Sequence, residues 1–284
     1  NLKTSIFYNN YNSDENRPFN YLIEKSFGFG TRIINTIKKS NHVINFGLEF
    51  YRENYLWKTF NNYGTDTEEK LTDQDEKRNN LLLFSKYEIN LNATTNINFG
   101  ISSNYIKYNW KTLEYDGNPQ ALKNNNTKKY KFNNIVSPKI SINKILFDKN
   151  IYFTISHGYS PPNIDETLDD KGLVNLNIKP ETGWNIELGT LGDFFENAVS
   201  YNISLYLMKI KNLLVAQRTA EDTYVGVNAG KTSHPGIEIT INSTIWDSVN
   251  GKNKITSEIN IFKNWYRFID FVNEDIDYSG NIIT

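Results

Sequence analysis

The sequence predicts an all-β protein built as an antiparallel up-and-down transmembrane β-barrel. Three observations predict this fold: apolar and polar residues alternate with a period of two, many alternating runs exceed the roughly 5–6 residues of a typical soluble strand, and short and longer connections alternate along the chain. Eleven strands are expected, near residues 1–9, 18–39, 42–57, 80–92, 96–112, 130–146, 150–160, 182–192, 197–215, 224–246 and 253–270.

The first strands show the alternation clearly. In 18–39, Phe27 and Phe29 share a face, and Gly28 and Gly30 lie on the other. In 42–57 the apolar face holds Ile44, Phe46, Leu48 and Phe50, while the opposite face holds Asn45, Gly47, Glu49 and Glu53. A period of two with β-branched and aromatic residues is typical of a strand with one wet face.

The later strands follow the same pattern. In 96–112 the expected inner face carries Asn98 and Asn104, and in 197–215 one face carries Val199, Tyr201 and Ile203. Tyr and Trp residues recur near expected strand ends, as they do at the two interfaces of a membrane barrel. From pattern alone, a soluble barrel or sandwich capped by these aromatics stays the alternative.

The connections indicate which strand ends lie together. Short links are expected near Ser40, Ala93, Phe147, Asp193 and 247–252, and longer polar links at 10–18, 58–79, 113–129, 161–181, 216–223 and beyond Phe271. A membrane barrel has short periplasmic turns and longer outer loops. We therefore expect 58–79, 113–129 and 161–181 to face the cell exterior, with the charged segment 64–77 as an exposed loop.

Composition narrows the function classes. The 284 residues include 14% aromatics and no Cys, and the net charge is −1. The charge gives no electrostatic footprint for nucleic acid, and the absence of Cys excludes disulfides and thiolate metal sites. No run of apolar residues approaches the length of a transmembrane helix.

Three motifs in order carry a resemblance to a known family. They are "ISHGYSPPNIDET" (155–167), "NLNIKPETGWNIELG" (175–189) and "VGVNAGKTSHPGIEI" (225–239). Together they resemble the C-terminal half of a TonB-dependent outer-membrane receptor barrel, and 84–105 resembles an earlier hairpin of that family. Ile178 replaces the usual Leu, and Ile101-Ser102 stands where Arg-Tyr is common.

The resemblance implies a barrel of about 22 strands closed around an N-terminal plug. Residues 1–284 are then expected to be a partial TonB-dependent receptor barrel domain that lacks the plug and the last strands.

The motif residues are interpreted mainly as structural. Proline lacks an N–H donor and stops strand pairing, glycine suits bulges or crowded positions, and a carboxylate on an inner face can be satisfied by water. The residues concerned are Pro161, Pro162, Glu166, Lys179, Pro180, Glu181, Glu187, Gly189, Asn228, Gly230, Gly236 and Glu238.

The resemblance also implies a function: uptake of a scarce ligand across the outer membrane of a Gram-negative bacterium, most often a ferric siderophore or other iron complex. The implied partners are outer-membrane lipid, the TonB protein through the missing N-terminal part, and a small-molecule metal complex, with no nucleic acid and no cofactor. Candidate ligand contacts in the loops are Trp57, Tyr63, Trp110 and Tyr115, which could instead be interface anchors.

The alternatives are a passive porin-like channel and a secreted β-sandwich carbohydrate-binding module. Enzymatic and metal-site interpretations are weak, because His42, His157 and His234 are far apart and lack ligand spacing. Asp165 and Glu166 with 169–170 could bind a hard cation, but a solvated acidic loop is the commoner explanation for such residues.

Overall fold

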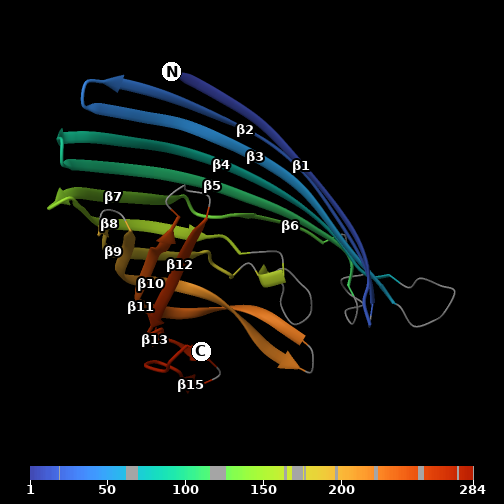
Figure 1. Cartoon of the computed structure of the whole chain (residues 1–284). Coiled ribbons are helices and arrows are strands. Elements are labelled where there is room, and N and C mark those ends of the chain that lie inside the picture. The colour runs from blue at the N-terminus through green and yellow to red at the C-terminus, as the bar shows by residue number, and fades with distance from the viewer. Residues whose placement is uncertain are drawn as a thin grey trace.

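One large antiparallel sheet dominates the computed structural model (Figure 1). The structure describes residues 1–18, 20–61, 70–115, 126–162, 165–167, 175, 177–195, 198–220, 223–248, 253–273 and 275–283. The sheet has thirteen strands, and eleven of them follow one another in chain order along a single path. The fold class predicted from the alternation is confirmed.

The path consists of β1 (Leu2–Asn16), β2 (Asn20–Lys39), β3 (His42–Asn61), β4 (Lys70–Asn92), β5 (Thr95–Tyr115), β7 (Ile135–Leu146), β8 (Lys149–Ser160), β9 (Glu181–Phe194), β10 (Val199–Ala220), β11 (Thr223–Asp247) and β12 (Lys254–Asn264). Two further strands pair beside it: β6 (Asn126–Lys131) on β5, and β13 (Arg267–Asp270) on β11. A short 3₁₀ helix, η1, spans Asp165–Thr167, and β14 (Val272–Asn273) pairs with β15 (Ile276–Asp277).

The two faces of the sheet differ in chemistry. Residues opposite each other on neighbouring strands share a face, and large exposed apolar side chains line up on one face, which we call the outer face. We call its central part the apolar belt, represented by Phe46, Leu83, Ile101, Phe153, Leu188 and Leu205. A continuous patch of exposed apolar side chains that runs across many strands marks a surface that contacts a membrane or another protein.

We call the opposite face the inner face. It carries the polar residues that alternate along each strand with the apolar residues of the outer face. Arg32 and Glu49 form an ion pair there, and Thr36 Oγ1 donates to Asn45 Oδ1 at 2.7 Å. The sheet curves along its length, so that β1–β5 arch over the later strands (Figure 1).

Two expected strands are each divided in the structure, which corrects the predicted boundaries. The run 130–146 forms β6 and β7, and both pair with β5. The chain leaves the ladder at 132–134, where the Phe132 ring is buried on the inner face. Similarly, 253–270 forms β12 and β13, which both pair with β11.

The expected loop 58–79 is also wrong in its extent. β3 continues to Asn61 and β4 begins at Lys70, so most of this charged segment is strand. Two ion pairs hold Asp73 in this strand: Lys58 Nζ on β3 lies 3.2 Å from Asp73 Oδ2 across the ladder, and Lys70 Nζ on β4 itself lies 2.9 Å from the same oxygen.

The expected links 10–18 and 216–223 are mostly strand too. β1 reaches Asn16, β10 ends at Ala220, and β11 begins at Thr223. Long and short links therefore do not alternate strictly.

Tight turns join consecutive strands at the ends of the hairpins opposite these links. They lie at Ser40, Ala93 and Phe147, as predicted. Phe147 and Asp148 have φ of 49° and 60°, the left-handed conformation of a two-residue hairpin turn. Among the described residues, no helix is long and apolar enough to cross a membrane.

Candidate functional site

A cluster of aromatic side chains lies on the inner face, toward the strand ends opposite the tight turns. Its buried members come from β5 and from the segment after β6, and half-buried rings from β3, β6 and β8 pack against them. The rings of Tyr108 and Phe132 are 5.1 Å apart, and those of Tyr108 and Trp110 are 5.4 Å apart, both edge to face. The inner aromatic cluster is Tyr55, Trp57, Ile106, Tyr108, Trp110, Tyr130, Phe132 and Tyr159.

The period of two creates this cluster. Residues 106, 108 and 110 fall on one side of β5, and the register places Tyr108 opposite Arg78 and Trp110 opposite Glu76 on β4. The polar residues of β4 therefore lie against the aromatic ones.

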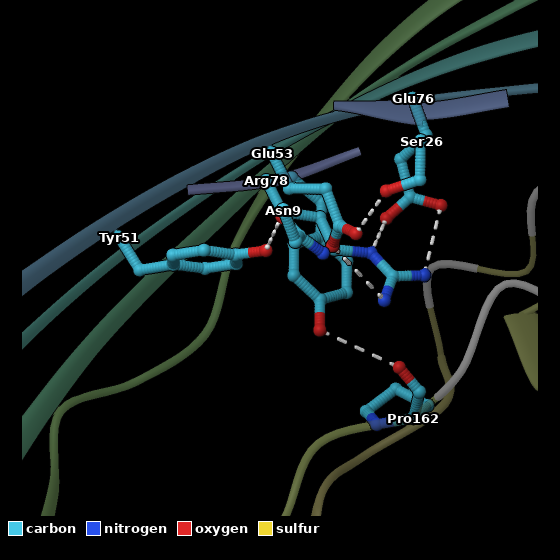
Figure 2. Close-up of polar contacts among 8 residues, drawn as sticks. Asn9, Ser26, Tyr51, Glu53, Glu76, Arg78 and Pro162 are labelled. Carbon is cyan, nitrogen blue, oxygen red and sulfur yellow. Dashed lines mark hydrogen bonds and ion pairs between the residues drawn. The ribbon is translucent and has the colours of Figure 1, made fainter. Parts of the chain in front are cut away.

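An arginine links two carboxylates beside this cluster. The Arg78 guanidinium pairs with Glu76, with Nη2 donating to Glu76 Oε2 at 3.3 Å, and Nη1 lies 4.0 Å from Glu53 Oε2. Ser26 Oγ donates to the other Glu53 oxygen at 2.6 Å. Figure 2 shows Arg78 between the two acids, on the side of the sheet where Pro162 lies. The guanidinium carbon also sits 5.2 Å from the Tyr108 ring centroid, a cation–π distance.

On β4 and β5 this site lies beyond the apolar belt. The last large exposed apolar residues of these two strands are Leu81 and Tyr105, and the strands continue past them to Glu76 and Tyr108. Burial raises the pKa of the Glu76 carboxyl, an effect that the neighbouring Arg78 opposes. Burial likewise raises the pKa of Tyr108 to about 12, so its hydroxyl stays protonated and lies 3.5 Å from the Pro162 carbonyl oxygen.

Several polar groups in and near the cluster lack a hydrogen-bond partner among the described residues. Both side-chain amide atoms of Gln74 are buried without one, and so is Trp57 Nε1. A buried polar group in a native protein is nearly always paired, so these groups are available to a ligand or to another segment. The arrangement is an aromatic wall with hydrogen-bond donors and acceptors, which suits ligand binding rather than catalysis.

Two of the family motifs meet at the start of β9. The Lys179 backbone N–H donates to Asn228 Oδ1 at 2.8 Å, and Asn228 Nδ2 donates to the Lys179 and Asn212 carbonyl oxygens, each at 2.9 Å. Glu181 Oε1 accepts from the Leu214 backbone N–H at 2.6 Å. Asn228 and Glu181 thus satisfy backbone groups where Asn212, with φ of 58°, interrupts the β10–β11 ladder.

Inner-face glycines lie beneath tyrosine rings. A Cβ at Gly189 would be 2.3 Å from the Tyr152 ring, and one at Gly236 would be 2.4 Å from the Tyr206 ring. Gly230 has a φ of +22°, and a Cβ there would lie 1.7 Å from the Asp270 carbonyl oxygen.

The other predicted residues are placed as follows. Trp57 and Trp110 lie within β3 and β5 rather than in loops; Tyr115 ends β5, with its side chain outside the described residues, and Tyr63 lies outside them altogether. Pro161 and Pro162 directly follow β8, Pro180 directly precedes β9, and Glu166 is in η1.

The inner-face acids follow the expected alternation. Glu187 accepts a hydrogen bond from Tyr152 Oη at 2.7 Å, and Glu238 lies on the inner face opposite Ser204. In the described part of the chain no group of three His, Asp or Glu could hold a metal ion; the Asp165 side chain and 169–170 are outside that part.

Sequence reasoning missed Glu76 and Arg78 because segment 64–77 was expected to be an exposed loop. Residues 70–77 are strand, and Glu76 is completely buried. No local signal could have found them, because every residue of 73–80 is polar and the two faces of the strand do not differ.

Comparison with known proteins identifies the family. All of residues 1–284 match the model of the TonB-dependent receptor-like β-barrel, so the chain belongs to this family. Receptors of this family are transporters, not enzymes, and lie in the outer membrane of Gram-negative bacteria. No curated protein matches the chain.

Solved structures agree in fold. The ferric yersiniabactin uptake receptor FyuA from Yersinia pestis is 17% identical with a TM-score of 0.67, over 99% of this chain and 42% of that one. The copper transporter OprC is 14% identical with a TM-score of 0.74, and the match covers 94% of this chain and 43% of that one. The siderophore receptor PiuA from Acinetobacter baumannii is 15% identical with a TM-score of 0.64, and the match covers 91% of this chain and 41% of that one. The chain thus spans about two fifths of the length of these proteins.

Proposed function

We propose that this chain forms part of the wall of a TonB-driven transporter that takes up a ferric siderophore or another iron complex across the outer membrane. The family match over residues 1–284 is the observation that carries the transporter assignment. The iron assignment is supported by the names of similar structures, which include receptors for ferric yersiniabactin, ferric citrate and ferripyoverdine.

The architecture supports a role as one wall of a larger barrel. Within the described residues, β1 and β12 each pair with a single neighbour along the path, which leaves two open edges. Unsatisfied backbone groups in hydrocarbon cost several kcal/mol each, so a sheet with an apolar belt needs further strands to close it. Lipid is then the partner of the apolar belt, and TonB is the partner of the whole receptor.

The inner aromatic cluster supports a role in ligand contact. Trp57 and Trp110 belong to it, and Gln74 offers unpaired amide atoms nearby. Aromatic side chains with a few polar groups beside them suit an organic chelator that itself carries aromatic groups. We propose Trp57 and Trp110 as ligand contacts on this wall. Tyr63 and Tyr115 are proposed as further ligand contacts from the sequence alone.

Growth of a receptor-deficient bacterium carrying the full-length gene tests this function. The panel comprises ferric catecholate, ferric hydroxamate and ferric citrate complexes, haem, a copper chelate, cobalamin and oligosaccharides. We expect growth on at least one iron complex, and none when TonB is deleted. Growth only on cobalamin, copper or a glycan would overturn the assignment to iron but support the assignment as a transporter. If growth on every compound that the protein takes up were independent of TonB, the assignment as a TonB-driven transporter would be overturned.

A further inference from the structure

A group of basic side chains surrounds a cleft on the outer face of the sheet. The cleft has a volume of about 320 Å³ and lies where β8, β9, β10 and β11 run side by side. We call it the lysine cleft; its cationic lining consists of Lys209, Lys211 and Lys231, with His157 and Trp184 beside them.

The strand register places all five side chains on the outer face. Trp184 is opposite both His157 and Lys209, and Lys211 is opposite Lys231. Two residues further along each strand toward the tight turns, the same face carries the apolar residues Ile155, Ile186 and Leu207, and beyond them the apolar belt. The lysine cleft therefore lies on the same face as the apolar belt, beyond its edge on the side away from the tight turns.

The positive charge of the cleft exceeds the negative charge that the described residues place beside it. Lys211 and Lys231 face each other directly across β10 and β11, and like charges in this position destabilise a sheet. The described residues that line the cleft include no carboxylate. Asp270, just outside it, lies 3.0 Å from Lys231 Nζ, in a pair whose two side chains are more than half exposed. One exposed carboxylate leaves an excess of positive charge around the cleft, so an anion is the expected occupant.

The position of the cleft indicates where that anion comes from. Trp184 is 46% exposed at the edge of the apolar surface, the position of interfacial aromatic residues. Lysines directly past such an edge extend their ammonium groups into the headgroup layer. The cleft lies on the side of the apolar belt away from the tight turns, where the expected orientation puts the outer leaflet.

We propose that the lysine cleft binds a phosphate group on the headgroup of a glycolipid in the outer leaflet. Lys209, Lys211 and Lys231 pair with the phosphate oxygens, Trp184 packs on the sugar or the first acyl carbons, and bound phosphate removes the repulsion between Lys211 and Lys231. The negative charge of a phosphate group complements the three ammonium groups, whereas a neutral headgroup does not.

Native mass spectrometry of the purified full-length receptor tests this proposal. The probe is diphosphoryl lipid A, compared with its dephosphorylated form, phosphatidylglycerol and inorganic phosphate. We expect diphosphoryl lipid A to bind at least about tenfold more tightly than each comparison compound, and the triple variant Lys209→Gln, Lys211→Gln, Lys231→Gln to lose this advantage.

A matched control has the same change of charge at the opposite end of the sheet: Lys38→Gln, Lys39→Gln, Lys254→Gln. These three exposed lysines lie near the tight turns, and this variant should bind like the native protein. Equal loss in both variants would show nonspecific attraction and overturn the site. Equal binding of the dephosphorylated lipid, of phosphatidylglycerol or of free phosphate would overturn the assignment to a phosphorylated glycolipid. Heat-dependent gel mobility verifies that both variants are folded barrels.

Discussion

Arg78 and Glu76 lie two residues apart on the inner side of β4 and form an ion pair in which the Glu76 side chain is completely buried. The same guanidinium reaches toward Glu53 on β3 and lies over the Tyr108 ring on β5. One side chain thus connects three neighbouring strands where they pass beyond the apolar belt.

Replacing Arg78 by Met should destabilise the receptor strongly. The change leaves the Glu76 carboxylate buried without its cation, and removing one partner of a buried pair typically costs about 3–5 kcal/mol. Urea unfolding of the full-length protein in lipid vesicles measures this free energy. Arg17→Met is the control, because Arg17 and Glu15 are both about half exposed; it should cost no more than about 1 kcal/mol. Equal costs in the two variants would contradict the structural importance of the buried pair.

The stability contributed by Glu76 should depend on pH. Burial raises the pKa of Glu76 in the folded state, so the folded protein holds this proton more tightly than the unfolded chain does. Stability from this group is fully present below the unfolded pKa and decreases as the pH rises through the raised folded pKa. As the pH rises above the ordinary glutamate pKa of about 4.3, the native protein should therefore lose stability relative to Glu76→Gln. A difference that stays constant, or grows in favour of the native protein, would show that the pKa is not raised.

Adjacent residues on β3 should respond oppositely to the same substitution. Phe46 lies on the apolar belt and Asn45 on the inner face. Phe46→Arg should destabilise the barrel by about 2–4 kcal/mol near the bilayer midplane, whereas Asn45→Arg should be tolerated much better because the inner face is wet. Folding into vesicles of defined thickness gives both values, and similar values at the two sites would disprove the assignment of faces.

Two glycines should differ in their tolerance of a methyl group. Gly189→Ala puts a Cβ against the Tyr152 ring and should cost about 1–3 kcal/mol through overpacking. Gly158→Ala is the matched control, since no atom lies within 4 Å of its added Cβ. Thermal unfolding of the full-length variants checks this, and Tyr152→Leu should restore stability to Gly189→Ala. An unaffected Gly189→Ala would mean that the ring moves aside freely.

Alternation predicted most of the sheet because residues such as Phe46 and Asn45 differ sharply in polarity. It failed at the start of β4, where both faces are polar: Asp73, Asp75 and Lys77 lie on one side and Gln74, Glu76 and Arg78 on the other. Such a segment resembles a loop until its partners on β3 and β5 are known.

The candidate site was predicted only in part for a related reason. Trp57 and Trp110 were singled out as aromatic residues, but their common face depends on the pairing of β3, β4 and β5. The contact between Lys179 and Asn228 likewise requires β9, β10 and β11 to be aligned. Long-range register of this kind is not encoded in any local pattern.

The central claim, that the chain belongs to an energy-driven importer of an iron complex, is tested most directly by initial uptake rates. Cells expressing the full-length receptor are given the radiolabelled ferric complex that supports growth, with and without TonB and with and without an uncoupler of the proton gradient. The account predicts saturable uptake that disappears in the absence of either TonB or the gradient. Uptake that rises linearly with concentration and persists without both would identify a passive channel and contradict the account.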